Sequence, residues 1–424
     1  MDFAESTQYL YSLGNEVSAM KLGLESIRTL LTALGDPQNN YLKVQVAGTN
    51  GKGSVCAFLN SICLEAGVKT GLYTSPHLVS ITERVKINGV DMGEDEFARF
   101  ATRVRETSEK LVTDSKLESV PTFFEQVTAI ALKAFAEAKV ELAILETGLG
   151  GRLDATTAAN SEIAAITRID IDHQEYLGNT IEEIAAEKAA IIQEHTKAVI
   201  IGEQKPEAMR VIEERLAMFV SNFWNDEEYD VHRTARVEES FIPEPFDANK
   251  LGIKGHHQIE NSKIAIMIAA ALRNHFPIES EQIVAGLENA RHPGRLEYNG
   301  CYLFDGAHNV SGAIALVTYL IMNEKRPITL LFGAMKDKNV TVILEILTSH
   351  AERIIVTEPS NSRSLSYGEL LEHLPPNLSK EKVFATDSVA NALDIAREIT
   401  PADGVILITG SLYLVGEAKK ILNN

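Results

Sequence analysis

Short apolar runs alternate with longer amphipathic stretches over much of the sequence, and this alternation limits the possible folds more than any other feature. Apolar runs of four to six residues are typical of strands buried on both faces, and the stretches between them suit helices that cover such strands. The pattern predicts an α/β fold with mostly parallel sheets. We expect strands over Leu42–Ala47, Leu142–Glu146, Ile163–Ile169, Ala198–Gly202, Tyr302–Asp305, Thr329–Gly333, Arg353–Thr357, Lys382–Thr386 and Val405–Thr409.

Two places interrupt the alternation and indicate how the chain divides. Glu227–Lys254 contains two prolines and short polar-apolar alternation, which predicts loops and a few antiparallel strands over Val231–Arg236 and Leu251–Lys254. Arg291–Arg295 contains a Pro-Gly pair that disfavours any regular element. We place a domain boundary there, with a larger domain over residues 1–292 and a smaller strand-helix series over residues 293–424.

Charge and composition narrow the class of protein. The 424 residues are 45% hydrophobic and carry a net charge of −19, and no segment approaches the roughly 18 consecutive apolar residues of a membrane span. A negative field repels nucleic acid and anionic membranes, so we expect neither as a partner. The N-terminus lacks the pattern of a signal peptide, and three cysteines form no disulfide framework. We therefore expect a soluble, cytoplasmic protein.

The strongest local motif lies between residues 44 and 54, which read Val-Gln-Val-Ala-Gly-Thr-Asn-Gly-Lys-Gly-Ser. A buried-type strand, a glycine-rich turn and a helical pattern follow one another in the order that a phosphate-binding loop requires. Lys52 can neutralise phosphate charge, and Ser54 can reach Mg²⁺. The match to the common loop motif is incomplete, because Val46 occupies the first glycine position and Gly53 separates Lys52 from Ser54. The alternative is an ordinary turn between strand and helix, but the motif favours a nucleotide-phosphate site.

Other catalytic signals are weaker. Gly148–Leu153 follows a predicted strand but lacks the third glycine of a dinucleotide-binding motif. Neither Gly53-Ser54 nor Gly410-Ser411 completes the G-x-S-x-G turn of a serine hydrolase. His256-His257 lacks the spacing of a zinc site. These patterns leave the phosphate loop as the main functional signal.

Polar residues follow several predicted strands, where open α/β sheets bind their ligands. Any one of them could simply cap the next helix. Together, a carboxylate, an imidazole and a hydroxyl near Lys52 would suit Mg²⁺ held by few protein ligands and by nucleotide phosphates. By its pattern alone, Lys188 would be a solvent-exposed helix residue. The strand-end residues are Thr74–His77, Glu146, Asp170, Asp172, His173, Asp305, His308 and Asn309.

These motifs, taken in order, resemble the folylpolyglutamate synthase and dihydrofolate synthase family of the Mur ligase superfamily. The resemblance runs over nearly the whole chain. It rests on Lys21–Glu25, Leu34–Gln38, Gly48–Ser54, Thr74–Leu78, Glu83-Arg84, Thr122–Glu125, Glu146, Gly148–Thr156, Asp172-His173, Leu177-Gly178, Glu187–Ala189, His257-Gln258, Asn261, Pro293–Glu297 and Asp305–Asn309.

The resemblance implies an N-terminal domain with a phosphate loop and a smaller, Rossmann-like C-terminal domain that acts as the glutamate-ligase domain. It also implies residue roles. The ATP contacts would be Thr49, Asn50, Gly51, Lys52, Gly53, Ser54, Asn261, Arg295 and Asp305. The metal ligands would be Ser75, Glu146, His173 and a carbamylated Lys188. The pterin substrate would meet Thr122, Phe123, Phe124, Glu125, Asp154, Ala155 and Thr156, and the catalytic residues would be Lys52, Lys188 and His308.

The implied reaction is the ATP-dependent addition of L-glutamate to a folate-type carboxylate, either dihydropteroate or a folate, through an acyl phosphate. The implied cofactors are ATP and Mg²⁺, with K⁺ as a candidate further ion. We expect a monomer. A cell-wall peptide ligase of the same superfamily is the nearer rival, but Gly53 before Ser54 and the Phe123–Glu125 segment argue against it. The more distant rival is a nucleotide-driven switch or motor subunit that uses the same phosphate loop without ligating anything.

Overall fold

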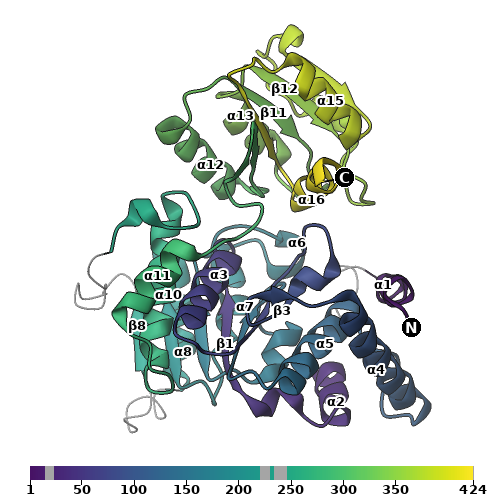
Figure 1. Cartoon of the computed structure of the whole chain (residues 1–424), viewed down its shortest axis with the longest axis vertical. Helices are drawn as coiled ribbons and strands as arrows, with labels where there is room; N and C mark the ends of the chain where they lie inside the picture. The colour runs from purple at the N-terminus through teal and green to yellow at the C-terminus, as the bar shows by residue number, and fades with distance from the viewer. Residues whose placement is uncertain (15–22, 220–229, 234–245, 424) are drawn as a thin grey trace. The chain divides into compact units, whose positions relative to one another are not determined.

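The computed structural model describes residues 1–14, 23–219, 230–233 and 246–423, and it divides into two compact units (Figure 1). The first unit contains Met1–His77, Ile81–Gly252 and Glu260–Arg291. The second contains Leu78–Ser80, Ile253–Ile259 and His292–Asn424. Each unit is built around its own mostly parallel sheet.

Within the described residues, the first unit has an eight-stranded sheet in the order β4-β3-β2-β5-β1-β6-β7-β8. The strand β1 lies between β5 and β6 and is parallel to both. Antiparallel pairing occurs where β3 joins β2 and β4. The strands are β1 (Leu42–Ala47), β2 (Thr70–Tyr73), β3 (Val85–Ile87), β4 (Val90–Asp91), β5 (Leu142–Glu146), β6 (Ile163–Ile166), β7 (Ala198–Ile201) and β8 (Asp230–Arg233).

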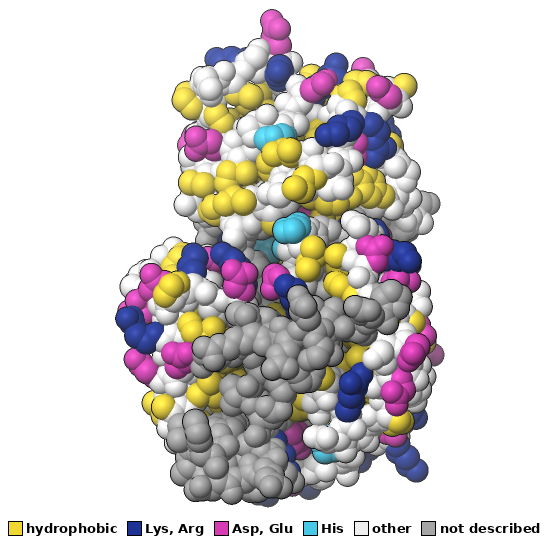
Figure 2. Space-filling view, turned by 90° about the vertical axis from the view of Figure 1, so that its left-hand side faces the viewer, with side chains coloured by type: hydrophobic (Ala, Val, Ile, Leu, Met, Phe, Trp, Pro, Cys, Tyr) yellow, Lys and Arg dark blue, Asp and Glu magenta, His cyan; other side chains and the backbone are white. Residues whose placement is uncertain are grey.

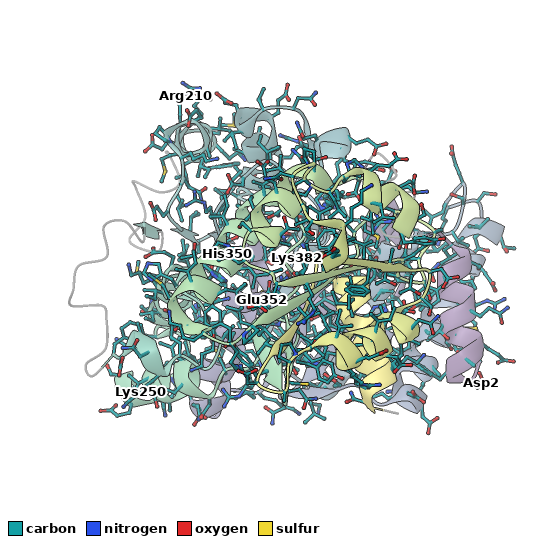
Figure 3. The ribbon with its side chains drawn as sticks, turned by 90° about the horizontal axis from the view of Figure 1, so that it is seen from above. Asp2, Arg210, Lys250, His350, Glu352 and Lys382 are labelled. Carbon is teal, nitrogen blue, oxygen red and sulfur yellow. The ribbon has the colours of Figure 1, made fainter. Side chains whose placement is uncertain are left out.

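Helices cover this sheet, and their apolar side chains pack against those of the strands. Asp2, labelled in Figure 3, accepts a hydrogen bond from the Glu5 N–H at 2.8 Å and so caps the first helix. The helices α4 and α5 lie side by side and share one core with β2, β3 and β5. The helices are α1 (Phe3–Ser12), α2 (Glu25–Ala33), α3 (Lys52–Glu65), α4 (Glu94–Thr113), α5 (Phe123–Ala138), α6 (Gln174–Leu177), α7 (Ile181–Ala189), α8 (Pro206–Ala217), α10 (His257–Leu272) and α11 (Ser280–Asn289), with 3₁₀ turns at Pro37–Asn40, Ile81–Arg84, Ala155–Ala159 and Ala248–Lys250.

The second unit has a six-stranded sheet in the order β13-β12-β11-β14-β10-β9, again counted over the described residues. Only the pairing of β9 with β10 is antiparallel in this sheet. The strands are β9 (Glu297–Asn299), β10 (Tyr302–Phe304), β11 (Ile328–Phe332), β12 (Arg353–Thr357), β13 (Val383–Thr386) and β14 (Val405–Thr409). The helices are α12 (Val310–Asn323), α13 (Val340–Thr348), α14 (Tyr367–Glu372), α15 (Val389–Ile399) and α16 (Leu412–Asn423), with a 3₁₀ turn at Lys380–Lys382.

The structure confirms the predicted α/β fold, and all nine predicted strands are present, several with ends shifted by a residue or more. The prediction for Ile163–Ile169 was too long, because β6 ends at Ile166. The later Ile169 is nevertheless fully buried, since it packs in the core with Leu177 and Ile184. Burial outside the sheet therefore made the strand look longer in the sequence than it is.

The prediction of antiparallel strands within Glu227–Lys254 was wrong where the structure describes this stretch. The strand β8 pairs with β7 in parallel, because α8 carries the chain back across the sheet between them. Leu251–Lys254 contains no strand. Residues 227–229 and 234–245 of this stretch, including the end of the strand predicted over Val231–Arg236, lie outside the described residues.

Hydrophobic side chains are grouped on the surface of the second unit that faces the viewer in Figure 2. The exposed large hydrophobic residues of this unit include Ile314, Ile321 and Met322 on α12.

Among the described residues, none of the helices combines the length and the apolar character needed to cross a membrane.

Candidate active site

The phosphate loop connects the central strand β1 to the start of α3. Gly48 and Gly51 have φ values of 152° and 94°, a backbone region that glycine enters without steric cost. Gly51 is the N-cap of α3 and provides no side-chain cap. The first N–H groups of a helix have no partner within the helix, and the helix dipole is positive at that end. The loop therefore presents a site suited to an anion at the start of α3.

The segment that follows β6 holds the phosphate loop in place. The N–H groups of Thr49 and Asn50 donate to the Arg168 carbonyl oxygen at 3.0 and 3.3 Å. The Thr49 hydroxyl also donates to the Asp170 carbonyl at 2.9 Å and accepts from the Asp170 N–H at 3.0 Å. The backbone N–H groups of Thr49 and Asn50 are therefore used to hold the loop against the segment after β6. Any phosphate contact from backbone N–H groups would fall to residues 51–54.

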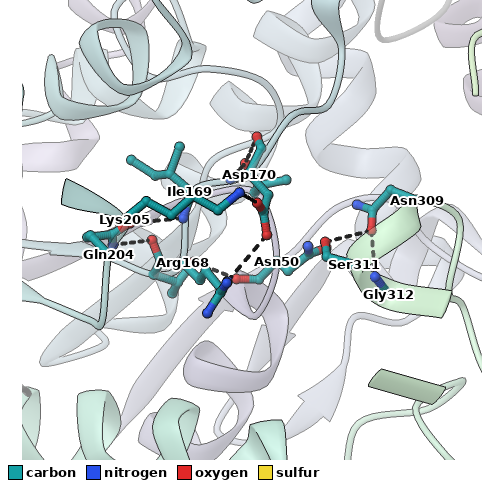
Figure 4. A network of polar contacts seen from close by, with 11 residues as sticks. Asn50, Arg168, Ile169, Asp170, Gln204, Lys205, Asn309, Ser311 and Gly312 are labelled. Atoms are coloured by element: carbon teal, nitrogen blue, oxygen red, sulfur yellow. Dashed lines mark hydrogen bonds and ion pairs between the residues drawn. The ribbon is translucent and has the colours of Figure 1, made fainter. Parts of the chain in front are cut away.

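A charged network supports this segment (Figure 4). The buried Asp170 carboxylate pairs with Lys205 Nζ at 2.5 Å and with Arg168 Nε at 3.3 Å. The Gln204 side chain donates to the Thr167 carbonyl at 2.9 Å and accepts from the Ile169 N–H at 3.0 Å. The loop thus rests on a segment that is itself held by side chains from the end of β7 onward.

Two lysine amines converge on the loop. Lys52 Nζ donates to the carbonyl oxygens of Gly48 at 3.1 Å and Thr49 at 3.3 Å. Lys188 Nζ, from α7, donates to the Gly48 carbonyl at 2.8 Å. Lys188 is buried, so the prediction from the sequence pattern alone that this side chain is exposed to solvent is wrong. Burial lowers the pKa of Lys188 to about 7, and the nearby charge of Lys52 contributes to that shift.

The carboxyl ends of β2, β5, β1 and β6 lie next to one another, because these four strands are adjacent and parallel. This arrangement brings Ser75, Glu146 and His173 to the edge of the sheet that carries the phosphate loop. The Ser75 N–H donates to Glu146 Oε2 at 3.2 Å. Among the described residues, no group of three or more His, Cys, Asp or Glu side chains is placed to hold a metal ion. A metal here would need ligands of other kinds as well.

The two segments predicted to contact a pterin come together in the first unit. The Phe124 ring fills the space over Gly148, where an added Cβ would lie 2.5 Å from a ring carbon. The Asp154 carboxylate accepts hydrogen bonds from the N–H groups of Gly148 and Leu149 at 2.8 and 2.9 Å. Burial raises the pKa of Asp154. Asp154 therefore shapes the turn on which the Phe124 ring rests.

Several members of these segments already have structural partners. Thr122 and Glu125 form a capping box at the start of α5, each side chain accepting from the other's N–H. Phe123 is buried, with Tyr11 stacked on it and the Arg84 guanidinium 5.3 Å from its ring centre. Phe124 is only partly buried and is the ring of this pair that remains partly accessible.

The second unit contains its own cluster around the end of β10. The Asp305 carboxylate accepts from the N–H groups of Leu296 and Ala307 at 2.9 and 3.0 Å, and burial raises the pKa of Asp305. Arg295 lies near Asp305, and His308 Nδ1 donates to the Gly306 carbonyl at 2.8 Å. Asp305 thus holds the turn that carries Arg295. Asn261 belongs to the first unit, where its side chain lies against Gly51 so closely that a Cβ at Gly51 would collide with it.

Comparison with known proteins agrees with this geometry. Residues 46–269 match the Mur ligase middle domain, and residues 294–412 match the Mur ligase glutamate ligase domain. The chain is 33% identical to the dihydrofolate synthase/folylpolyglutamate synthase of Bacillus subtilis, with 95% of each chain covered. The chain belongs to the folylpolyglutamate synthase/dihydrofolate synthase family of Mur ligases.

Other members of this family extend the likeness. A probable bifunctional folylpolyglutamate synthase/dihydropteroate synthase of Haloferax volcanii is 35% identical over 99% of this chain, and the chain spans 50% of that longer protein. The folylpolyglutamate synthase of Mycobacterium tuberculosis, solved with ADP and AMPPCP, has a TM-score of 0.87, 28% identity, and coverage of 100% of this chain and 99% of that one. A bifunctional synthase solved with Mn, AMPPNP and L-glutamate has a TM-score of 0.83, 27% identity, and coverage of 100% and 98%.

The family resemblance did not single out every residue that shapes the phosphate loop. Thr167 lay inside the strand predicted over Ile163–Ile169, and Lys205 followed a strand without forming part of a motif. Asp170 was noted only as one of several candidate residues for a Mg²⁺ site, and its role as a support of the loop was missed. Their positions depend on contacts between segments about 35 and 120 residues apart in the sequence. The one available signal was the polar Thr-Arg-Ile-Asp run directly after an apolar strand.

Proposed function

We propose that the chain catalyses the reaction of its family, the ATP-dependent formation of an amide bond between L-glutamate and a folate-type carboxylate. The observation that carries the proposal is the convergence of Lys52 Nζ and Lys188 Nζ on the Gly48 carbonyl, in the loop that leads from β1 to α3. The Lys52 amine and the N-terminus of α3 concentrate positive charge at this loop in a protein whose net charge is −19, and Lys188 lies against the same carbonyl. Such a site suits a polyphosphate.

A carboxylate is a poor electrophile and must be activated before an amine can attack it. A carboxylate oxygen of the substrate attacks the γ-phosphorus of ATP, and ADP leaves, which forms an acyl phosphate. The amine of L-glutamate then attacks the acyl carbon, phosphate leaves and the nitrogen loses a proton, which completes the amide. Lys52 and the N–H groups of residues 51–54 are placed to offset charge on the transferring phosphoryl group.

A divalent cation fits the same edge of the sheet. We infer Mg²⁺, because this ion is commonly held by one or two carboxylates together with nucleotide phosphates. Glu146, with Ser75 beside it, would provide the carboxylate and hydroxyl, and His173 lies in the segment after β6, on the other side of β1. When bound, the cation would neutralise charge on the phosphates. A requirement for K⁺ remains a prediction, and activity assays with and without K⁺ test it.

We further propose that Lys188 is carbamylated. A neutral amine bonds to the carbon of CO₂ and releases a proton, which turns the side chain into an anion that can bind a metal. The amine of Lys188 is buried beside Gly48 and close to Asp172, so the group is held where an anionic oxygen would face the nucleotide site. Lys188→Ala should lose activity and regain part of it with added short carboxylic acids. A plain lysine in the electron density of a nucleotide-bound crystal grown with bicarbonate would contradict the proposal.

We assign the pterin substrate to the region of Phe124, Asp154, Ala155 and Thr156, where a partly accessible ring lies over the Gly148 turn. Both dihydropteroate and reduced folates are the proposed acceptors. In the second unit, Arg295 and His308 are the side chains we assign to the nucleotide and the reacting groups. Asp305 supports them through the turn that it holds.

The deciding experiment incubates the purified protein with ATP and Mg²⁺, and then omits L-glutamate, the pterin acceptor, or both. The proposal predicts ADP formation that depends on both substrates, and a product heavier by one glutamyl unit in mass spectrometry. Equal ADP formation without either substrate, and no heavier product, would favour the nucleotide-driven switch. Separate assays with dihydropteroate and with tetrahydrofolate test the two acceptors. Light scattering tests the proposed monomer, and cell fractionation tests the proposed cytoplasmic location.

A further inference from the structure

Thr167 is the first residue after β6, and its hydroxyl lies directly behind the phosphate loop. The hydroxyl donates to the Asn50 carbonyl oxygen at 2.7 Å, with the Ala47 carbonyl as a second acceptor at 3.3 Å. A hydroxyl has one proton, so the shorter contact to Asn50 is the main bond. The Thr167 side chain is fully buried. It therefore joins the strand beside β1 to the middle of the loop.

The same hydroxyl occupies the space over Gly48. A Cβ at Gly48 would overlap Thr167 Oγ1, and Gly48 has the positive φ of 152°. Thr167 and Gly48 thus fit each other: the glycine leaves room for the hydroxyl, and the hydroxyl fills that room. No charged group is needed for this contact, so it holds the loop without competing with phosphate for the two lysines.

The contact also determines which way the loop backbone faces. The Asn50 carbonyl points back to Thr167, while the N–H groups of Thr49 and Asn50 point back to the Arg168 carbonyl. A peptide group that is held at both its carbonyl and its neighbouring N–H groups cannot rotate freely. Gly51 and the first turn of α3 follow directly, and their N–H groups are the ones left to face a nucleotide.

We propose that Thr167 is a positioning residue of the nucleotide site, which fixes the Thr49–Gly51 turn through its hydroxyl so that the N–H groups at the start of α3 converge on phosphate. This inference rests on the proposed function for the identity of the ligand as ATP. It adds a residue that touches neither substrate nor metal and acts only through the backbone of the loop.

The test compares Thr167→Val, which keeps the shape and removes the hydroxyl, with Thr167→Ser, which keeps the hydroxyl. Binding of a non-hydrolysable ATP analogue in the presence of Mg²⁺ is measured by calorimetry. We expect about tenfold weaker binding for Thr167→Val, as is typical when a buried carbonyl loses its donor, and binding within about threefold of wild type for Thr167→Ser. In turnover assays, the KM for ATP should rise in Thr167→Val while the KM for L-glutamate stays unchanged.

Thr147→Val is the matched control. Thr147 is also buried, and its hydroxyl donates to another carbonyl of β1, that of Val46, at 3.2 Å, so this bond is made to the strand and not to residues 48–51 of the loop. This variant should bind the analogue as wild type does. If Thr167→Val does not fold, Thr167→Ser and Thr167→Ala are compared instead, because they differ only in the hydroxyl oxygen. The serine variant should then bind the analogue about tenfold more tightly than the alanine variant.

Equal analogue binding by wild type and a folded Thr167→Val, or an equal loss in Thr167→Val and Thr147→Val, would overturn the positioning role. The binding assay does not depend on ligation. A wild-type protein that binds the analogue but adds no glutamate would contradict the proposed function, and the comparison of the Thr167 variants would still decide the positioning role.

Discussion

Replacing Lys188 by methionine removes a buried amine at the nucleotide site, and the expected result is an inactive protein that is more stable near neutral pH. The folded chain holds the pKa of Lys188 at about 7, mainly because of burial, against an ordinary value of 10.5. Methionine has a similar length and no charge to desolvate. The variant therefore exchanges a costly functional group for an apolar side chain.

The direction in which the stability of the wild type changes with pH follows from how many protons Lys188 binds in the folded and unfolded chains. Between pH 7 and 10.5 the unfolded chain binds more protons at Lys188 than the folded chain does, so the stability of the wild type rises with pH across that window. The two pKa values correspond to a destabilisation of about 4 kcal/mol at pH 7 and about 2 kcal/mol at pH 9. Losing the hydrogen bond to the Gly48 carbonyl costs about 1 kcal/mol, since Lys52 still donates to that oxygen.

Urea unfolding followed by circular dichroism, in buffers freed of CO₂, measures the difference. At pH 7 Lys188→Met should be more stable than wild type by about 3 kcal/mol, and at pH 9 this advantage should shrink by about 2 kcal/mol. The control is Lys110→Met, which makes the same change of charge at an exposed position of α4. An advantage that does not change between pH 7 and 9, or that equals the effect of Lys110→Met, would refute the reasoning.

Three further predictions concern the loop, the helix that carries Lys188, and the acceptor. Lys52→Ala should reduce turnover by about 100-fold or more at saturating ATP without changing the melting curve, because the side chain contacts loop carbonyls and not the core; near-normal turnover would remove Lys52 from the mechanism. Gly151→Ala should destabilise the protein by about 2 kcal/mol in urea unfolding. Its Cβ would lie 2.7 Å from the Glu187 carbonyl oxygen and 2.9 Å from the Lys188 carbonyl oxygen. The control is Gly93→Ala, because a Cβ at Gly93 would meet open space. Phe124→Ala should raise the KM for the pterin substrate by about 2- to 10-fold and leave the KM for ATP unchanged in initial-rate assays, because ring stacking contributes about 0.5–1.5 kcal/mol; equal changes in both KM values would argue against stacking.

Local sequence was a reliable guide where a residue's role depends on its neighbours in the chain. The glycines of the phosphate loop, its lysine and the strand before it lie within about ten residues, and the structure places them as the pattern predicts. The capping box of Thr122 and Glu125 was also visible as a four-residue pattern. The family resemblance nevertheless directed attention to a substrate role for these two residues, and their local structural role was overlooked.

Sequence pattern was a poor guide where burial depends on distant segments. Lys188 has an ordinary helical setting, but its amine reaches a carbonyl 140 residues away in the chain. Ile169 extended an apolar run beyond the end of β6, because it lies outside the strand but is buried in the core that the helices form on this sheet. The direction of β8 likewise depends on the crossover through α8, which the composition of the strand does not encode.

The sequence by itself thus determined the α/β class, nine of the strands of the two sheets in outline, and the phosphate loop between β1 and α3. These features follow from hydrophobic periodicity and from the backbone freedom of glycine, both of which are properties of short segments. Only the tertiary structure decided that Lys188 is buried and that Thr49 and Asn50 turn their N–H groups toward Arg168. Such outcomes depend on hydrogen bonds and desolvation between segments that meet only after the strands have paired.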